Sequence, residues 1–197
     1  MALVERILSR PYDDGFSFVD IAVHEMSHPH MNYPGFEVTT IACLGQTRTT
    51  IRMDLGIGDI VVAERKAISL LALDERPLFE SEISLQVYPP SYIFAEKLEA
   101  IVYRGGINSR MKDFYDLIAL FKFPGLDLKA SKNVIRSVFE HRQTSLPTRL
   151  SYDLQAMETL SRSWKRFHNT LENEFQQKAP ADFLDVIARI DQMLALL

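Results

Sequence analysis

The hydrophobic periodicity changes once along the chain, near residues 88–90, and this change restricts the possible folds. Before it, apolar residues alternate in short β-rich runs such as "FSFVDIAV", "FEVTTIACL", "TTIRMDLGI" and "ISLQVY", which is typical of strands. After it, they recur every three or four residues in "SYIFAEKLEAIVYR", "MKDFYDLIALF", "ASKNVIRSVFEH" and "FLDVIARIDQMLALL", which predicts helices. The order predicts an α+β fold, with a β-rich portion at 1–89 and a helical domain at 90–197.

Length and composition exclude several classes of protein. The 197 residues suffice for one domain with a sizeable core, or for two small ones. A net charge of −4 gives no global attraction to nucleic acid, so such binding would need a local basic patch. The single Cys43 cannot form an internal disulfide, and no apolar run is long enough to cross a membrane. Residues 1–10 lack the apolar segment of a signal peptide, so we expect a cytoplasmic protein without membrane contact.

The segment "VHEMSHPH" at residues 23–30 places His24, Glu25 and His28 at the HExxH spacing of zinc peptidases. That chemistry needs both histidines on one face of a helix. The preceding β-branched residues favour a strand, in which the histidines would be about 13 Å apart at roughly 3.3 Å per residue, and Pro29 disfavours a helix at His28. We therefore interpret the motif as an accidental match at the end of a strand and expect no zinc. A zinc peptidase is the minor alternative.

Lys97 lies in the apolar stripe of the first predicted helix, with Ile93, Phe94 and Ile101 one turn away. One explanation is that its stem packs against apolar neighbours while the ammonium group reaches water. The other is that the stripe faces a cleft, where the ammonium group binds an anion. This helix alone leaves both explanations open.

The segment after this helix predicts a tight helical hairpin. The glycine pair at 105–106 is expected to end the first helix, and Asn108 or Ser109 to cap the second. Such a hairpin can bring Lys97 and Asp113 together.

Asp113 and Asp116 also lie in the apolar stripe of the second predicted helix. A buried lysine and a buried aspartate are tolerable only as partners, so Lys97 and Asp113 are interpreted as a pair. The pair is either a structural link between two helices, or a lysine that holds a phosphate beside a carboxylate that orients it or binds metal. The residues by themselves do not decide between these roles.

Asp54 is the third residue of interest. In "TTIRMDLGI" the apolar and polar side chains alternate, which places Asp54 on the polar face of the predicted strand together with Thr50 and Arg52. A carboxylate on a strand, near a lysine on a flanking helix, is an arrangement that can hold Mg²⁺ and a nucleoside triphosphate.

Residues 87–117, "VYPPSYIFAEKLEAIVYRGGINSRMKDFYDL", resemble the AbiEii/AbiGii nucleotidyltransferase toxins, whose members carry an "AEKL" helix followed by a "KDxxDL" helix. The stretches "DDGFSF", "YPGFEV" and "IRMDLGIGD" are similar to the same family in the same order. The resemblance implies a partial DNA polymerase β-like nucleotidyltransferase sheet followed by a C-terminal helical bundle. It also implies a toxin of a toxin–antitoxin system that acts in abortive infection, a form of phage defence.

The resemblance further implies a reaction and the residues that perform it. Such toxins use Mg²⁺ to transfer a nucleotide from a nucleoside triphosphate to an acceptor, which in some relatives is the 3′ end of tRNA. Lys97 matches the family's essential lysine, Asp113 its helix carboxylate, and Asp54 the third aspartate of the sheet, expected to bind metal. Asp116 matches an aspartate with a structural or supporting role.

The remaining implications concern ligands and partners. Arg110 and Lys112 are expected to bind the nucleotide together with Lys97. A cognate antitoxin protein is the expected macromolecular partner.

The chain departs from the family's pattern at its beginning. The family starts with a Gly-Ser or Gly-Gly-Thr turn and an Asp-x-Asp pair that supplies most of the metal coordination, and neither motif occurs in this sequence. With one strand carboxylate left, magnesium binding should be weak. The start resembles a position after the family's first catalytic strand and helix, which implies a non-catalytic remnant, a site completed by another polypeptide, or a fragment of a longer reading frame.

The missing segment leads to an alternative function. A sheet that lacks a central strand should expose an edge, which favours a homodimer. The alternative is therefore a non-catalytic interaction module that binds an antitoxin or a second copy of itself.

The basic residues of the C-terminal half alternate with acids, so we expect a solvated face rather than an RNA-binding patch. They are Arg136, Arg142, Arg149, Arg162, Lys165 and Arg166. The aromatic residues Trp164, Phe167 and Phe175 have helical spacing and are predicted to lie in the core.

Overall fold

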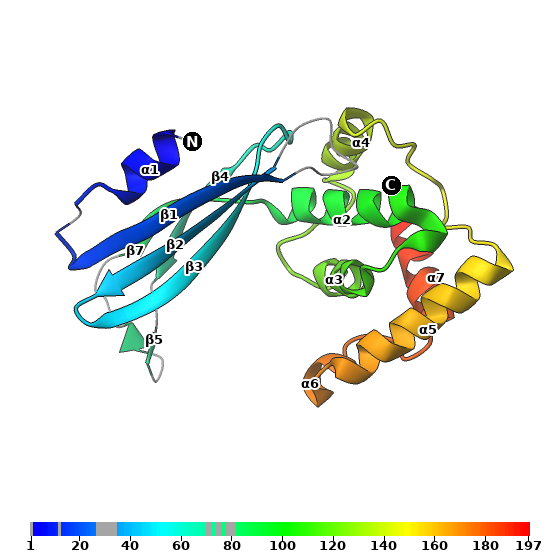
Figure 1. Ribbon diagram of the computed structural model, residues 1–197. Coiled ribbons are helices and arrows are strands. Elements are labelled where there is room, and N and C mark those ends of the chain that lie inside the picture. The colour runs from blue at the N-terminus through cyan, green and yellow to red at the C-terminus, as the bar shows by residue number, and fades with distance from the viewer. Residues whose placement is uncertain (1, 12, 27–34, 70–71, 74–75, 78–81) are drawn as a thin grey trace. The chain divides into compact units, whose positions relative to one another are not determined.

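The computed structural model describes residues 2–11, 13–26, 35–69, 72–73, 76–77 and 82–197 (Figure 1). It divides into two compact units, Met1–Asp59 and Ile60–Leu197. The α+β prediction is confirmed, because antiparallel sheets precede a set of helices. The seam predicted at residues 88–90 falls inside the second unit, where a strand passes directly into a helix.

An antiparallel sheet makes up most of the first unit. After the short helix α1 (Ala2–Leu8), strands β1 (Phe16–Met26), β2 (Gly35–Leu44) and β3 (Thr47–Gly56) pair in the order β1-β2-β3. Gly45 connects β2 to β3 with a φ of 57°, a conformation that glycine adopts without strain in a two-residue hairpin. A bulge interrupts β1 between Val19 and Ala22, and the Thr40 hydroxyl donates to the Val19 carbonyl at 2.8 Å.

The strand predicted around the HExxH segment is confirmed for the residues that the structure describes. His24 and Glu25 lie in β1, opposite Glu37 and Phe36 of β2. A strand directs these two side chains to opposite faces, which contradicts the helix that a zinc peptidase requires. His28 lies outside the described residues.

The second unit begins with a separate hairpin. Strand β4 (Glu64–Ser69) pairs antiparallel with β7 (Glu82–Val87), and the two-residue strands β5 (Ala72–Leu73) and β6 (Arg76–Pro77) pair with each other. The predicted strand at "ISLQVY" corresponds to β7. Strand β4 was not predicted, because the charged residues 64–66 hide any apolar alternation.

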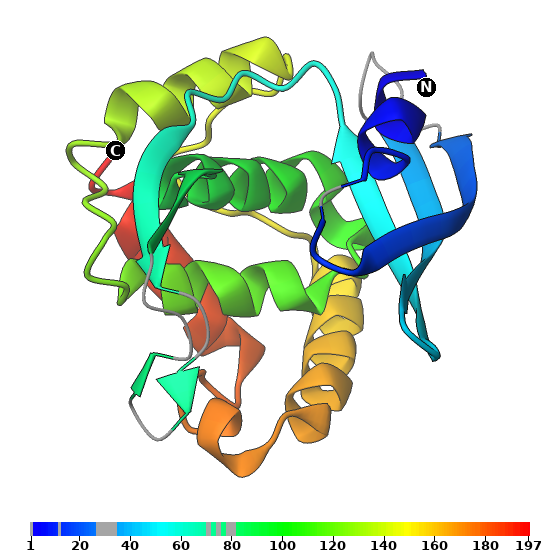
Figure 2. The ribbon, with the colours of Figure 1, turned by 90° about the vertical axis from the view of Figure 1, so that its left-hand side faces the viewer.

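Helices form the rest of the second unit. They are α2 (Pro90–Arg104), the 3₁₀ turn η1 (Gly105–Ile107), α3 (Met111–Phe121), α4 (Lys132–His141), α5 (Leu154–Thr170), the four-residue α6 (Asn173–Gln176) and α7 (Phe183–Leu194). Figure 2 shows α2 and α3 side by side. Helix α2 also packs against α4, and α3 packs against α5 and α7.

The main hydrophobic core lies among these helices. Its largest fully buried side chains include Phe94 and Leu98 of α2, Phe114 of α3, Trp164 of α5 and Phe183 of α7. The predicted core position of Trp164 is confirmed, and its indole N–H donates to the Pro180 carbonyl at 3.0 Å.

The predicted core position of Phe175 is wrong. Its side chain is 42% exposed because it lies on the short helix α6, and the Lys178 ammonium group lies 5.1 Å from the centre of its ring. The cation can therefore interact with the face of the ring at the surface.

Tyr152 carries a buried hydroxyl that has no hydrogen-bond partner among the described residues. Burial, together with the charge of Asp191, raises the pKa of Tyr152 from 10.0 to about 12. We expect Tyr152→Phe to raise the free energy of unfolding by about 1 kcal/mol at pH 7, because an unpaired buried hydroxyl is removed. Urea titration of the variant and the parent protein measures the difference.

The same variant has a second expected effect, at alkaline pH. Above pH 10 the unfolded chain loses the Tyr152 proton while the folded chain retains it, so the parent protein loses stability between pH 10 and about 12. The variant should lack this part of the loss. Equal alkaline slopes in the two proteins would show that the hydroxyl is not buried in the folded state.

Candidate functional site

The site is built on the hairpin of α2 and α3. Helix α2 follows Pro89 and has Pro90 in its first turn, a position where proline's missing N–H costs no hydrogen bond. It ends at Gly105, whose φ of 51° suits glycine and is rare for other residues. Gly106 comes so close to α5 that an added Cβ would lie 2.5 Å from the Cβ of Ala156. The predicted helical hairpin is thus confirmed, and its turn contacts α5.

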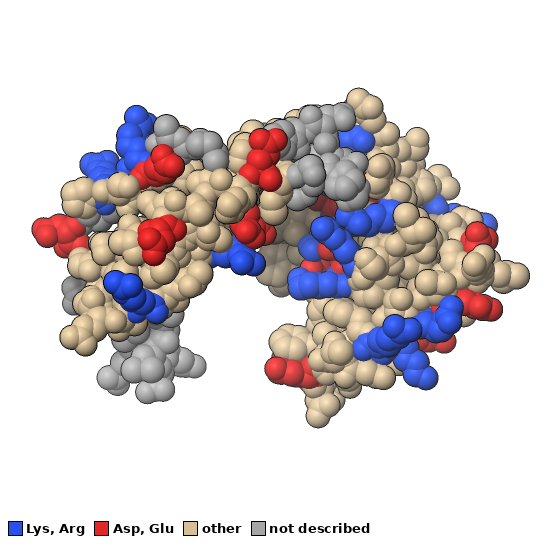
Figure 3. Space-filling model, viewed as in Figure 1, with Lys and Arg blue, Asp and Glu red and all other residues tan. Residues whose placement is uncertain are grey.

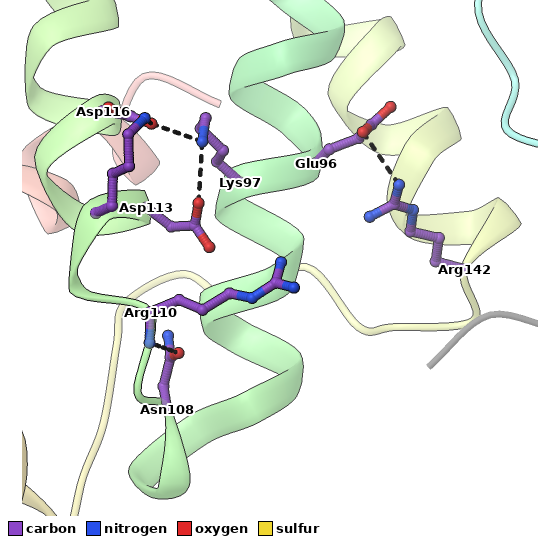
Figure 4. Close-up of polar contacts among 8 residues, drawn as sticks. Glu96, Lys97, Asn108, Arg110, Asp113, Asp116 and Arg142 are labelled. Carbon is purple, nitrogen blue, oxygen red and sulfur yellow. Dashed lines mark hydrogen bonds and ion pairs between the residues drawn. The ribbon is translucent and has the colours of Figure 1, made fainter. Parts of the chain in front are cut away.

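The start of α3 differs from the prediction. Neither Asn108 nor Ser109 is its N-cap, because the helix begins at Met111 and Arg110 occupies the cap position without a side-chain hydrogen bond. Asn108 is buried and its side-chain oxygen accepts the backbone N–H of Arg110 at 2.8 Å (Figure 4). Asn108 therefore holds the turn that precedes the helix.

Two ion pairs join α2 and α3, and a third lies within α3 (Figure 4). The Lys97 ammonium group lies 2.9 Å from Oδ1 of Asp113 and 2.7 Å from Oδ2 of Asp116. Lys112 approaches the same Oδ2 of Asp116 at 2.8 Å. The prediction that the hairpin brings Lys97 and Asp113 together is confirmed, and Asp116 proves to be a second direct partner of Lys97.

These ion pairs keep Lys97 charged. Burial alone would lower the pKa of Lys97, but hydrogen bonds to Asp116 and Asp113 and the charges of both carboxylates outweigh it, so the pKa is raised above 10.5. A lysine in this state cannot act as a general base at neutral pH, and it can act as a fixed positive charge. Its side chain is 23% exposed, so part of it remains accessible.

The Lys97–Asp113 pair lies between two hollows of the second unit. Lys97 and Asp116 line an apolar groove of about 320 Å³ together with Ile93, Leu120 and Phe123. Asp113 lines a larger cavity of about 540 Å³ at the start of α3, which we call the α3–α5 cavity because both helices contribute to its wall. Its other lining residues are Ser109, Arg110, Met111, Lys112, Ser163, Arg166 and Phe167.

Asp113 has an unusual second oxygen. The residue is 8% exposed, and its Oδ2 is buried without a hydrogen-bond partner among the residues that the structure describes. A buried carboxylate oxygen without a hydrogen bond is unusual in proteins, and it leaves Asp113 more dependent on its ion pair with Lys97.

The other predicted site residues are distributed as follows. Arg110 and Lys112 lie at the start of α3 and line the α3–α5 cavity. Asp54 is exposed on β3 of the first unit, where it pairs in register with Glu37 of β2. The expected alternation of β3 is confirmed for Ile51 and Met53, which are half-buried, while Asp54 faces water. The lysine and the helix carboxylates thus form a cluster within the second unit alone.

A second charged network joins α2 to the end of α4. Arg142 pairs with Glu99 at 3.1 Å and with Glu96 at 3.2 Å, and the Thr144 hydroxyl donates to Glu99 at 2.6 Å. Figure 4 shows the Arg142–Glu96 contact. The Tyr88 hydroxyl donates to the other oxygen of Glu96.

This network corrects the prediction for Arg142. Its side chain is 9% exposed, so it belongs to a nearly buried ion pair and not to a solvated face. The sequence does contain one indication of this network. Glu99 lies between Leu98 and Ile101 on the apolar stripe of α2, where a buried carboxylate needs a cationic partner.

The helices of the described residues are too short or too polar to cross a lipid bilayer. Within the same part of the chain, no three His, Cys, Asp or Glu side chains gather closely enough to hold a metal ion.

Comparison with known proteins identifies the family. No curated protein gives a match. Residues 2–190 match the family described as "Nucleotidyl transferase AbiEii toxin, Type IV TA system". The match extends well beyond residue 117, where the last of the resembling sequence segments ends, and it covers the hairpin that carries Lys97 and Asp113. A nucleotidyltransferase family implies a nucleoside triphosphate as substrate, and a type IV system implies a cognate antitoxin. The chain therefore belongs to the AbiEii nucleotidyltransferase toxin family of type IV toxin–antitoxin systems.

Proposed function

We propose that this protein transfers a nucleotide from a nucleoside triphosphate to an RNA acceptor such as tRNA, and that Lys97 binds the triphosphate. The observation that carries the proposal is a partly accessible lysine held by two carboxylates on the rim of an apolar groove. The two carboxylates occupy two of the three N–H groups of the ammonium ion, and the third remains for a phosphate oxygen.

The surrounding charges support binding of an anion. Lys97, Arg110 and Lys112 contribute three positive charges on the hairpin, and Asp113 and Asp116 contribute two negative ones. The excess is positive and lies next to the groove and the α3–α5 cavity. The apolar wall of the groove, which includes Phe123, suits a nucleobase.

The proposed reaction assigns separate tasks to these residues. The acceptor hydroxyl oxygen bonds to the α-phosphorus, the bond from that phosphorus to the β-phosphate oxygen breaks, and pyrophosphate leaves with the electron pair while the hydroxyl proton passes to a base. Lys97 neutralises charge on the phosphates. Asp113 fixes Lys97 through Oδ1. Asp116 supports the position of Lys97.

Magnesium is part of the proposed reaction, and carboxylate oxygens are its usual protein ligands. Asp54 is the residue proposed to contribute, but one carboxylate supplies little to a cation that takes about six ligands. The described residues do not bring three candidate ligands together. The residues present therefore fit a complete magnesium site poorly, and no step assigned to Lys97, Asp113 or Asp116 depends on one.

Transfer of radiolabel tests the proposal. The purified protein is incubated with tRNA and each of the four nucleoside triphosphates labelled at the α-phosphate, with and without Mg²⁺. We expect label to enter the RNA from at least one nucleotide, with release of pyrophosphate. If all four triphosphates neither bind in calorimetric titration nor transfer label, the nucleotidyltransferase proposal is wrong for this chain.

The second candidate function is a non-catalytic module that binds its antitoxin or itself. The absence of Asp-x-Asp from the sequence favours it, as does a sheet in which β1 and β3 are edge strands. A concentration-dependent dimer in sedimentation experiments, together with no nucleotide binding, would support the module. A monomer that binds nucleotide would contradict it.

A further inference from the structure

The α3–α5 cavity has a composition that the role of Lys97 does not explain. Three of its lining side chains are cationic, two carry hydroxyls and one is aromatic: Arg110, Lys112, Arg166, Ser109, Ser163 and Phe167. Figure 3 shows Lys and Arg side chains gathering over α3 and along α5. The protein's net charge is −4, so this concentration of positive charge is local.

The start of α3 adds to the attraction for anions. No side chain caps this end of the helix, and the first turn of a helix carries a partial positive charge. Arg110, Lys112 and Arg166 are exposed, and within the described part of the chain only Lys112 forms an ion pair, with Asp116. The cavity therefore offers several cations to the phosphates of one ligand.

The aromatic and hydroxyl groups narrow the choice of ligand. Phe167 is half-buried, packed edge-on against Tyr115 at 6.2 Å between ring centres, and still lines the cavity. Cations that follow a phosphate backbone, beside an aromatic ring on which a base can stack, are the combination used to bind single-stranded nucleic acid. Serine hydroxyls can bond to phosphate or ribose oxygens.

We propose that the α3–α5 cavity binds the sugar–phosphate backbone of a single-stranded RNA, with Arg110, Lys112 and Arg166 on the phosphates and Phe167 against a base. The inference rests on the proposed function only in taking this strand as the acceptor. The Lys97–Asp113 pair then separates the two substrates. Lys97 lines the groove assigned to the triphosphate, and Asp113 lines the cavity assigned to the RNA.

Two adjacent residues of α5 provide a matched test. Arg166 and Lys165 are both exposed cations, but only Arg166 lines the cavity. Binding of a fluorescein-labelled single-stranded RNA of about ten nucleotides is measured by anisotropy over a range of salt concentrations. We expect Arg166→Ala to weaken binding about five- to tenfold and to reduce the slope of log K against log salt by about 0.7, the value for one phosphate contact on a single strand. Lys165→Ala should stay within about twofold of the parent protein.

A third variant tests the cavity without a change of charge. Ser163→Leu fills part of the space and should also weaken RNA binding, with circular dichroism confirming that the protein is folded. Equal weakening of RNA binding by Arg166→Ala and Lys165→Ala would overturn the proposal, because it would indicate general electrostatic attraction to the basic surface and not binding in the α3–α5 cavity. Duplex RNA that binds as tightly as the single strand would also overturn it, because stacked bases cannot reach Phe167.

The same preparations separate this inference from the proposed function. If the protein transfers label but Arg166→Ala leaves its RNA binding unchanged, the cavity assignment is refuted and the nucleotidyltransferase proposal stands. RNA binding that depends on Arg166, in a protein that transfers no label, would support the cavity and refute the enzyme.

Discussion

Replacement of Lys97 by alanine is expected to abolish detectable binding of nucleoside triphosphate and to lower nucleotidyl transfer at least about a hundredfold, the usual cost of removing a preorganised charge from a reacting group. The reason is that Lys97 is the lysine held by both Asp113 and Asp116 on the rim of the groove. Calorimetric titration and label transfer measure the two effects. Lys122→Ala is the control, since Lys122 is an exposed lysine just after α3.

The loss of Lys97 also has a structural cost that must be separated from its functional one. Alanine would leave Asp113, which is 8% exposed, without its cationic partner, and this is expected to destabilise the protein by about 3 kcal/mol. A double variant, Lys97→Met with Asp113→Asn, removes both charges and should recover much of the stability without recovering activity. Activity in the double variant near that of the parent protein would show that the pair is only a structural link between α2 and α3.

The pKa of Lys97 adds a dependence on pH. Because the folded-state pKa lies above 10.5, the stability that the ion pairs contribute is fully present below pH 10.5 and is lost as the pH rises through the folded value. Lys97 therefore stays charged over the neutral range, and its titration should not limit activity there.

The second large effect is expected at Arg142. Replacement by alanine would remove the ion-pair partner of the Glu99 carboxylate, whose side chain is 7% exposed, and leave it the hydrogen bond from the Thr144 hydroxyl. Breaking a buried ion pair in this way costs about 3–5 kcal/mol, which is a large part of the stability of a typical domain. Urea unfolding of Arg142→Ala measures the loss, and Arg136→Ala on the exposed face of α4 is the control.

A double variant shows whether the cost comes from the unpaired charge. Replacing Glu99 and Arg142 together by methionine removes the two most buried charges of the network and roughly keeps the volume. Glu96 loses Arg142 as a partner, but its side chain is 23% exposed, so most of the lost stability should return. Equal losses in Arg142→Ala and Arg136→Ala would mean that the network does not hold α2 to α4.

The sequence predicts the helical hairpin well because the relevant signals are local. The three-to-four spacing in "MKDFYDLIALF" gives the bounds of α3, and Gly105 marks the end of α2 through its positive φ. The contact of Lys97 with Asp113 follows from the same hairpin, because two charges on facing apolar stripes can be buried only as partners.

Other features depend on residues that are distant in the sequence or on small differences in geometry. Glu99 and Arg142 are 43 residues apart, and nothing in the local pattern of "ASKNVIRSVFEH" indicates their contact. Asn108 and Ser109 are both good capping residues, but the Asn108 side chain bonds to the turn and the helix begins two residues later. The metal-binding role of Asp54 and the nucleotide-binding role of Arg110 and Lys112 remain predictions from the family resemblance. The position of Arg110 and Lys112 in the α3–α5 cavity is the basis for assigning them to RNA phosphates instead.

The close approach of Gly106 to Ala156 has a consequence for how the protein can change over evolution. Since no methyl group fits between Gly106 and the Ala156 side chain, the contact of the Gly106 backbone with the Ala156 methyl group sets the spacing of the two elements, and the outward side chains of α5 do not. Substitutions at Ser163 or Arg166 can then alter how tightly the α3–α5 cavity binds the RNA proposed as its ligand, while the lysine–aspartate pair keeps its geometry. Ligand affinity and chemistry would thereby be free to diverge independently among relatives.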